Sequence, residues 1–507
     1  MGAATKMLDL WILIDFVVII NTITSFVIVF REKRDISATW AWLLVLLALP
    51  VLGFLLYLFA GRKLSHRRIF DLKAQEPLGI DQIVANQKLK DDDNELLPAN
   101  QVTNSARELV RLFLETDNAV LTKRNAVRIY TDGEKLFESI FEDVRRAKHH
   151  INIEFFTWYN DRIGQEFVRI LEKKARHGVH VRVIYDTLGS HGSKQKLFKH
   201  LVELGGQVEP FLTSKFLPFT LRLNFRDHRK LVIIDGKTGY IGGFNVGDQY
   251  LSRKERFGYW RDTHLRVVGD AVLSIQSRFF LDWNATTKRD HVKFDQRYFP
   301  RTNSNGSTSM QIVSSGPDDD REKIKQGYVK MISIATKSIY IESPYFVPDV
   351  SVLEALSIAA TAGIDVRLII PDRPDHPFVY RATEYYSREL MNAGGKVYTY
   401  ENGFMHSKMV VIDGKMVSIG SANMDIRSFK LNFEANAFLY DREFAHATEL
   451  IFLHDQQKSR FLTSEYFQQQ THLVKIKQTL SRLLAPILWD QKKDASPRRP
   501  FDVELDY

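Results

Sequence analysis

The sequence predicts an α/β protein made of two similar halves that share one site, preceded by a two-helix transmembrane hairpin. Two observations predict the duplicated part: a nine-residue motif occurs twice, and the segments around it recur at a spacing of roughly 185 residues. A third observation predicts the hairpin, because two long apolar stretches precede residue 61.

The two apolar stretches lie at about residues 10–30 and 40–60, with the charged residues 31–35 between them. Each stretch is long enough to cross a hydrocarbon core of about 30 Å. Trp40 and Tyr57 stand near the ends of the second stretch, a position typical of the membrane interface. We therefore predict a transmembrane hairpin over residues 1–63. A signal peptide fits less well because the first stretch is too long, and two buried soluble helices are the other alternative.

The charge of the chain favours an anionic partner. The formal net charge is +9, so nucleic acid and an anionic membrane are both candidate partners. Basic residues are more numerous on the side of the hairpin that carries the rest of the chain, which predicts a cell-membrane protein with a cytoplasmic catalytic domain. These residues are Lys6, Arg62, Lys63, Arg67 and Arg68, against Arg31, Lys33 and Arg34 in the loop. The chain has no cysteine, so disulfides and thiolate metal sites are excluded.

The rest of the chain divides into a linker, two α/β halves and a tail. We expect a polar linker over 64–101, a first half over 102–290, a second linker over 291–309, a second half over 310–489 and a flexible tail over 490–507. Each half is predicted to run strand, helix, strand, helix, strand, motif strand, strand. The recurring segments are 151–156 with 339–344, 178–184 with 363–369, and 205–208 with 394–397.

Apolar periodicity predicts the helices at the two ends of this region. Residues 103–116 have helical spacing and a Ser/Thr start, and residues 136–147 show one apolar face. Near the C-terminus a similar stripe is formed by Leu473, Ile476, Leu480, Leu483, Leu484 and Ile487. This stripe is compatible with packing on the domain and with contact with lipid.

The repeated motif spans residues 228–236 in the first half and 406–414 in the second. Each copy has His, one spacer, Lys, four apolar residues and Asp-Gly, and each is followed by a small-residue turn that ends in Asn. Strand alternation places the His and the Lys of one copy on the same face. The matched polar residues are His228, Lys230, Asp235 and Asn245, and His406, Lys408, Asp413 and Asn423. One such motif is weak evidence, whereas two copies at matched offsets are difficult to obtain by chance.

These residue types are suited to phosphoryl transfer, which needs a nucleophile, a proton donor for the leaving oxygen and positive charge around the phosphate. Imidazole can attack when neutral and donate a proton when charged, so one histidine from each half fits this division. The residues alone leave open which histidine attacks. The lysines supply charge and the asparagines supply neutral hydrogen-bond donors. We therefore expect no metal and no other cofactor.

Three further pairs of acidic residues recur in the two halves. Asp262 and Glu434 follow their motifs at similar distances and are predicted to orient the histidines. Asp235 and Asp413 complete the catalytic motifs, although their position before glycine favours a structural role such as capping a turn. The third pair, at positions 154 and 342, could neutralise the site lysines or support the strand ends.

The paired H-x-K-x4-D motifs, each with G-x-x-N, resemble the phospholipase D superfamily. The hairpin and several other stretches are similar to bacterial cardiolipin synthases, and the similarity runs from about residue 10 to 488. These stretches are 40–44, 49–53, 224–230, 343–349 and 482–488. The resemblance implies phosphatidyl transfer between two phosphatidylglycerol molecules through a phosphatidyl-histidine intermediate, giving cardiolipin and glycerol. It implies that His228 is the nucleophile and His406 the acid and base, with anionic membrane lipid and no nucleic acid as partner.

The first turn departs from the pattern of the superfamily, because Gly242-Gly243 stands where many members have Gly-Ser. We therefore expect unequal phosphate contacts in the two halves. The alternatives are a membrane-bound phospholipase D that releases phosphatidic acid, a nucleic-acid phosphodiesterase and a non-catalytic membrane scaffold. The hairpin disfavours the nuclease, and the two intact motifs disfavour the scaffold. The choice of an alcohol over water as acceptor rests on the resemblance alone.

Overall fold

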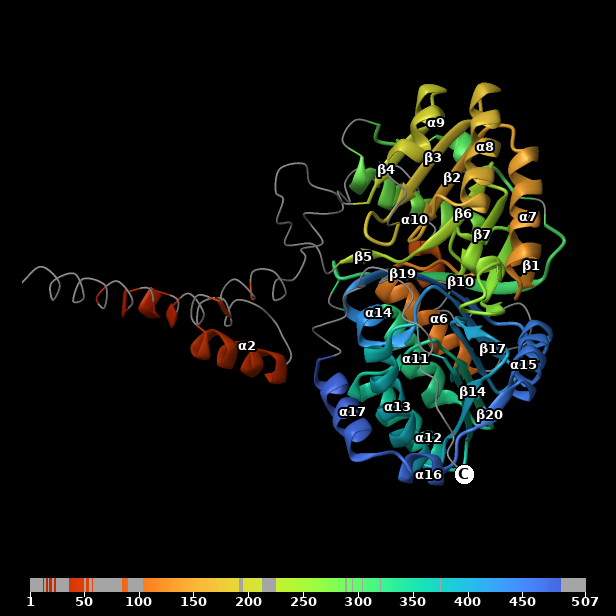
Figure 1. The fold of residues 1–507 in the computed structure, drawn as a ribbon. Coiled ribbons are helices and arrows are strands. Elements are labelled where there is room, and N and C mark those ends of the chain that lie inside the picture. The colour runs from red at the N-terminus through yellow and green to blue at the C-terminus, as the bar shows by residue number, and fades with distance from the viewer. Residues whose placement is uncertain are drawn as a thin grey trace, which may run out of the picture.

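The computed structural model describes residues 104–190, 195–211, 225–287, 290–293, 295–302, 304–319, 321–373 and 375–484. It also describes residues 36–49 and 84–89 and scattered positions between 12 and 57. Within these residues the fold is mixed α/β, with the first half above the second in Figure 1.

The predicted hairpin falls largely outside the described residues. Its described part includes helix α2, Ile36–Ala48, of 13 residues. Among the described residues no helix has both the length and the apolar character needed to cross a bilayer. Most of the predicted linker at 64–101 and all of the predicted tail at 490–507 also lie outside the described residues.

The elements of the first half follow the predicted alternation of strands and helices. Asp132 accepts a hydrogen bond from the Lys135 amide at the start of α7, and the predicted apolar face of this helix is buried. The elements are β1 Thr122–Tyr130, α7 Gly133–Arg146, β2 His150–Phe155, α8 Arg162–Arg176, β3 His180–Tyr185, α9 Lys199–Glu203, β4 Gln207–Pro210, β6 Lys230–Ile234, β7 Thr238–Gly242, β9 His264–Gly269 and α10 Ala271–Thr286.

The second half repeats this order and adds elements at its end. The repeated elements are β10 Thr308–Ser315, α11 Lys323–Ile334, β11 Ser338–Glu342, α12 Val350–Thr361, β13 Asp365–Pro371, α13 Pro377–Asn392, β14 Lys396–Tyr400, β16 Met409–Ile412, β17 Met416–Gly420, β19 Asn432–Leu439 and α15 Arg442–Gln457. The added elements are β20 Ser459–Phe461, α16 Ser464–Gln468 and α17 His472–Leu484.

One sheet runs through both halves. Its order is β20-β14-β13-β11-β16-β17-β19-β10-β1-β9-β7-β6-β2-β3-β4, so the order of strands on one side of the central β10–β1 pair mirrors that on the other. The two motif strands, β6 and β16, therefore occupy matching places. This arrangement confirms the predicted duplication at the level of topology.

Helices cover both faces of the sheet, as Figure 1 shows. On one face α7 and α8 bury a core in the first half, and α11 and α12 bury a separate core in the second. On the other face, α10 and α15 share one core that includes Leu231 of β6 and Val411 of β16. The shared core holds the two motif strands in a fixed relation.

Helix α6, Asn104–Asp117, packs on the second half, although the predicted boundary at residue 102 assigns it to the first. Its apolar face contacts the core beneath α11, and the rings of Phe113 and Phe438 lie 4.4 Å apart. Helix α6 thus packs on the second half although it precedes the strands of the first, and this contact joins the two halves.

Two pairs of short strands cross between the halves. Strand β5, Arg226–Asp227, pairs with the start of β19, and β8, Trp260–Arg261, pairs with β15, Phe404–Met405. Next to these pairs, the His228 amide donates to the Phe433 carbonyl at 2.9 Å and the His406 amide donates to the Arg261 carbonyl at 2.7 Å. Each histidine is thus fixed by main chain from the opposite half.

Candidate active site

Each histidine of the two motifs is paired with a carboxylate of the other half. The Nδ1 atom of His228 lies 2.9 Å from both carboxylate oxygens of Glu434. The Nδ1 atom of His406 lies 2.5 Å from Oδ2 of Asp262. The structure therefore brings together all four predicted residues in two crosswise pairs, and the sequence did not indicate that the pairs would cross.

The two carboxylates are ionised, which fixes the tautomer of each imidazole. Burial alone would raise the pKa of Glu434, but His228, Lys230 and Ser421 together lower it. Burial likewise opposes ionisation of Asp262, and Lys408 and His406 lower its pKa. A carboxylate only accepts hydrogen bonds, so Nδ1 of each histidine carries the proton. The lone pair of the neutral ring then lies on Nε2, the nitrogen free to react.

Burial favours the neutral form of both histidines in the free site. Burial lowers the pKa of His228 to about 4, although Glu434 opposes the shift. Burial and the neighbouring Lys408 also lower the pKa of His406. Aromatic rings flank both imidazoles, with Phe156 at 5.0 Å from His228 and Trp260 at 5.0 Å from His406. These rings are among the groups that bury the imidazoles, and burial favours the uncharged form.

The two motif lysines lie beside their own histidines. Lys230 donates to the His228 carbonyl at 2.5 Å, and Lys408 donates to the His406 carbonyl. In the second half, the Lys408 Nζ atom also lies 2.9 Å from Nδ1 of His406. Burial lowers the pKa of Lys230 to about 7 and that of Lys408 to about 8. Their charge is therefore available near neutral pH but is easily lost above it.

The two predicted asparagines are nearly buried beside the histidines' strands. Asn245 accepts a hydrogen bond from the Thr157 main-chain amide at 3.0 Å through its side-chain oxygen, and its side chain also hydrogen bonds with the Tyr250 hydroxyl. The main-chain amide of Asn423 donates to the Ser428 hydroxyl at 3.1 Å, and this hydrogen bond stabilises the turn that carries Asn423.

Two buried arginines, which the repeated motifs do not indicate, support the orienting carboxylates. Arg229 donates to the Glu434 carbonyl at 3.2 Å and pairs with Asp282 at 2.8 Å. Arg261 donates to the Asp262 carbonyl at 2.5 Å and pairs with Asp455 at 2.6 Å. Each arginine thus holds the main chain of the residue that orients a histidine. The arginines stand at non-equivalent positions, one inside the motif and one before Asp262, so the repeat gave no signal for them.

The missing serine in the first turn has a local explanation. The Ser421 hydroxyl of the second turn donates to Oε2 of Glu434 at 2.5 Å, so it serves the orienting carboxylate. In the first turn a Cβ at Gly243 would lie 2.0 Å from Oδ1 of Asp262, so the carboxylate fills the place of a side chain. That oxygen accepts a hydrogen bond from the Thr263 amide at 2.7 Å instead.

Asp235 and Asp413 lie at the ends of the motif strands remote from the histidines. Asp235 accepts from the amides of Lys148 and His149 at 2.8 Å and of His150 at 3.0 Å. Asp413 binds the matching amides of residues 336–338. Both have positive φ, 54° and 53°. Each aspartate connects a turn to the chain before the neighbouring strand, and these contacts favour the structural role that the position before glycine predicts.

The third acidic pair, Glu154 and Glu342, is buried next to the groups that support the site. Glu342 accepts from Nη2 of Arg261 at 3.2 Å, so it belongs to the network that holds Asp262. Burial and the nearby Asp227 raise the pKa of Glu154 well above its ordinary value. The support role predicted as one of two options fits both residues better than pairing with the lysines.

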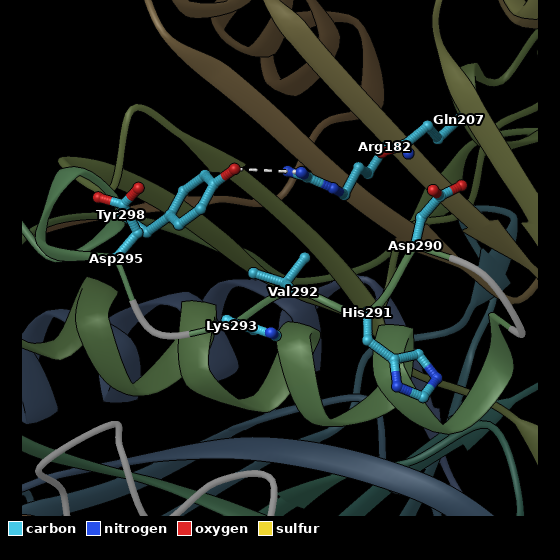
Figure 2. A pocket seen from close by; sticks show the side chains of 8 residues that line it. All are labelled: Arg182, Gln207, Asp290, His291, Val292, Lys293, Asp295 and Tyr298. Atoms are coloured by element: carbon cyan, nitrogen blue, oxygen red, sulfur yellow. Dashed lines mark hydrogen bonds between the residues drawn. The ribbon is translucent and has the colours of Figure 1, made fainter.

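A hollow of about 400 Å³ lies apart from the paired histidines, and Figure 2 shows its lining. Arg182 donates to the Tyr298 hydroxyl at 3.1 Å across it, with Lys293, Asp290 and Asp295 around the rim. None of the predicted site residues lines this hollow. Among the described residues there is also no group of three or more His, Asp or Glu side chains arranged to hold a metal.

Comparison with known families and proteins gives consistent matches. The family model described as "Cardiolipin synthase, PLD-like domain" matches residues 140–258 and 328–456, one stretch in each half. A second model, "Phospholipase_D-nuclease N-terminal", matches residues 19–62.

Curated relatives cover nearly the whole chain. The cardiolipin synthase of Listeria innocua serovar 6a is 48% identical over 476 residues, which is 94% of this chain and 99% of the relative. The cardiolipin synthase of Staphylococcus aureus strain Mu50 is 46% identical over 470 residues, 93% of this chain and 95% of the relative. Among solved structures, the phosphatidylserine synthase of Haemophilus influenzae Rd KW20 has a TM-score of 0.57 at 16% identity, covering 75% of this chain and 98% of that protein. This last likeness concerns the fold alone.

Proposed function

The chain belongs to the cardiolipin synthase family of phospholipase D-like phosphatidyltransferases, and on that basis we propose how its two histidines divide the reaction. The substrate is phosphatidylglycerol, which acts first as donor and then as acceptor. The observation that carries the proposal is the crosswise pairing of His228 with Glu434 and of His406 with Asp262. Each pair leaves an Nε2 atom available at the junction of the halves.

In the first step Nε2 of His228 attacks the phosphorus of phosphatidylglycerol. A P–N bond forms while the P–O bond to the head-group glycerol breaks, and protonated His406 gives its Nε2 proton to the departing oxygen. The imidazole of His228 becomes positively charged in this step, and Glu434, bonded to Nδ1, stabilises that charge.

In the second step the terminal hydroxyl of another phosphatidylglycerol attacks the phosphorus. His406 accepts the hydroxyl proton, the new P–O bond forms, and the P–N bond breaks to return the lone pair to His228. The products are cardiolipin and glycerol, and both histidines regain their starting states. Lys230, Lys408, Asn245 and Asn423 hold the phosphate oxygens through both steps.

His406 must be protonated before the first step although it is neutral in the free site. A bound phosphodiester brings a negative charge next to the imidazole, and an adjacent opposite charge favours the cation. Substrate binding therefore raises the pKa of His406 and prepares it as the acid. Asp262 contributes in the same direction.

The enzyme is placed at the cell membrane by a two-span hairpin over residues 1–63, with the catalytic domain in the cytoplasm. The two apolar stretches and the match of an N-terminal family model over residues 19–62 support this arrangement. A lipid acceptor is then present at high local concentration, which favours transfer over hydrolysis.

The test is a product assay with the purified full chain in phosphatidylglycerol vesicles. We expect cardiolipin and glycerol as the main products, and no product from His228→Ala or His406→Ala. Phosphatidic acid as the main product would contradict the synthase proposal and favour a hydrolase. Unchanged activity in either histidine variant would remove the assignment of the site.

A further inference from the structure

The last described helix, α17, turns its apolar side away from the protein. Leu473, Ile476, Leu480 and Leu483 follow one another at spacings of three, four and three residues, so they share one face. Their exposed fractions are 70%, 55%, 51% and 59%. A helix that belongs to a soluble surface shows the opposite arrangement, with its apolar stripe toward the core.

The polar side of α17 attaches it to the domain. Gln478 and Ser481 are buried on that side, and Gln478 donates to Glu384 of α13 at 3.2 Å. Arg482 donates to the Tyr385 hydroxyl of the same helix at 2.7 Å. These contacts fix the rotation of α17, so the exposure of its apolar stripe is imposed by the fold.

The charge of α17 favours an anionic bilayer over a second copy of the chain as the partner of the stripe. The helix carries Lys475, Lys477 and Arg482 and no acidic residue. A second copy of the chain docked through this face would bring like charges together, whereas an anionic bilayer complements them. An apolar stripe flanked by basic residues is the pattern of a helix that lies in the membrane interface.

The position of α17 relates this surface to the reaction. Figure 1 shows α17 along the outer side of α13. Helix α13 in turn contacts β12, Phe346–Val347, which pairs with β18, Met424–Asp425, directly after Asn423. Helix α13 and the β12–β18 pair therefore lie between α17 and Asn423, a predicted phosphate ligand of the site.

We propose that the face of α17 formed by Leu473, Ile476, Leu480 and Leu483 is a docking surface that inserts into the anionic lipid bilayer beside the catalytic site. It holds the catalytic domain against the lipid from which both substrates come. This inference rests on the proposed function only in taking the substrate to be a bilayer lipid.

Contact with lipid can be measured directly because the chain has no cysteine. Ile476→Cys in the full chain is labelled with an environment-sensitive fluorophore and reconstituted into vesicles containing phosphatidylglycerol. We expect a blue-shifted emission that spin-labelled lipids quench, and a smaller shift in vesicles of phosphatidylcholine alone. Arg146→Cys is the matched control, because this side chain is 71% exposed and α7 lies on the other side of Figure 1 from α17.

A label at 476 that behaves like the label at 146 would overturn the proposal. So would a blue shift that rises with protein concentration in detergent and resists lipid quenchers, because it would assign the surface to a second copy. The measurement needs no turnover, so it is repeated in the His406→Ala background. Lipid contact that persists there separates this inference from the proposed mechanism.

An activity measurement gives a second readout. We expect Ile476→Ser/Leu480→Ser to lower kcat/KM at least about tenfold on phosphatidylglycerol in vesicles, since two apolar side chains no longer enter the lipid. Activity on a short-chain, monomerically dispersed phosphatidylglycerol should stay within about twofold of the parent. An equal loss on both substrates would contradict the docking role, and an unchanged thermal midpoint verifies that the variant is folded.

Discussion

Each histidine of this enzyme depends on the carboxylate that holds its Nδ1 atom. His228 is held by Glu434 and His406 by Asp262, and the two carboxylates come from opposite halves. The orientation and tautomer of each ring are therefore set by a residue roughly 200 or 140 positions away in the chain. Each half therefore supplies one histidine of the site and the carboxylate that orients the histidine of the other half.

Removing either carboxylate should impair catalysis without unfolding the protein. We expect Glu434→Gln and Asp262→Asn each to lower kcat by about 10²–10⁴, because the amide no longer fixes the tautomer with Nε2 free. Cardiolipin formation in vesicles measures the loss. Glu401→Gln is the control, since Glu401 is half exposed and pairs with Arg460 on the surface. A loss below about threefold in both site variants would contradict the orienting role.

We expect the two buried lysines to set the alkaline limit of activity. Burial lowers the pKa of Lys230 to about 7 and of Lys408 to about 8, so both lose their charge as the pH rises through this range. We expect kcat/KM to fall above about pH 7–8 and kcat to fall at higher pH, because the bound phosphate stabilises the charged lysines.

The corresponding variant is Lys230→Arg, in which the charge cannot be titrated at the position with the lower pKa. Its kcat/KM should be lower, but the alkaline midpoint should move upward by about one unit, to the range in which Lys408 loses its charge. A midpoint identical to that of the parent enzyme would show that another group controls this limb. The low pKa of His228, about 4, keeps its neutral form dominant throughout the measured range.

At the scale of elements, the two turns after the motif strands contact the orienting carboxylates in different ways. In the second turn Ser421 donates to Glu434, while in the first turn Gly243 leaves room for Asp262. The departure from Gly-Ser in the sequence was interpreted as an inequality in phosphate contacts. The structure relates it to the orienting carboxylates, and the phosphate contacts themselves remain a prediction.

Exchanging the residues of these turns should therefore have unequal effects. Gly243→Ser introduces a Cβ at 2.0 Å from Oδ1 of Asp262, which must move from His406, and we expect a loss in kcat of about 10² or more. Ser421→Gly removes one hydrogen bond to a carboxylate, and we expect a loss of about 10- to 100-fold. Steady-state kinetics measures the loss in kcat of each variant, and a thermal unfolding scan verifies that the variant is folded. Full activity in Gly243→Ser would contradict the proposed space constraint.

Much of the fold was predictable because the two halves repeat their elements and motifs. The alternation of strands and helices, the motif strands and the buried face of α7 all follow from local periodicity. The crossed pairing of histidines and carboxylates could not be predicted in this way, because the position of a residue after its motif does not determine which half its side chain faces. The roles of Arg229 and Arg261 were also hidden, since Ser407 and Phe433 occupy the equivalent positions in the other half.

At the scale of the whole molecule, the junction of the halves is both the site and a structural interface. The central β10–β1 pair, the shared core and helix α6 join the halves, and Arg261 crosses to a buried pair of carboxylates, Glu342 and Asp455. A buried cation with two carboxylates contributes to stability mainly because its removal leaves them uncompensated.

Arg261→Met should accordingly destabilise the folded protein by about 3–5 kcal/mol, measured by denaturant unfolding in detergent. Arg124→Met is the control, because Arg124 forms an exposed pair with Asp270 and should change the stability by about 1 kcal/mol or less. Equal effects of the two substitutions would contradict the view that the junction depends on the buried arginine.

The division of labour between the histidines is tested most directly by trapping the covalent intermediate. The full chain is mixed with phosphatidylglycerol that carries a label in its phosphatidyl group, quenched and examined for protein-bound label under conditions that preserve phosphohistidine. We expect label to accumulate on the His406→Ala protein with a donor whose leaving group needs no proton, and we expect none on His228→Ala. Label on His228→Ala and none on His406→Ala would reverse the assignment, and label on neither would contradict a phosphatidyl-histidine intermediate.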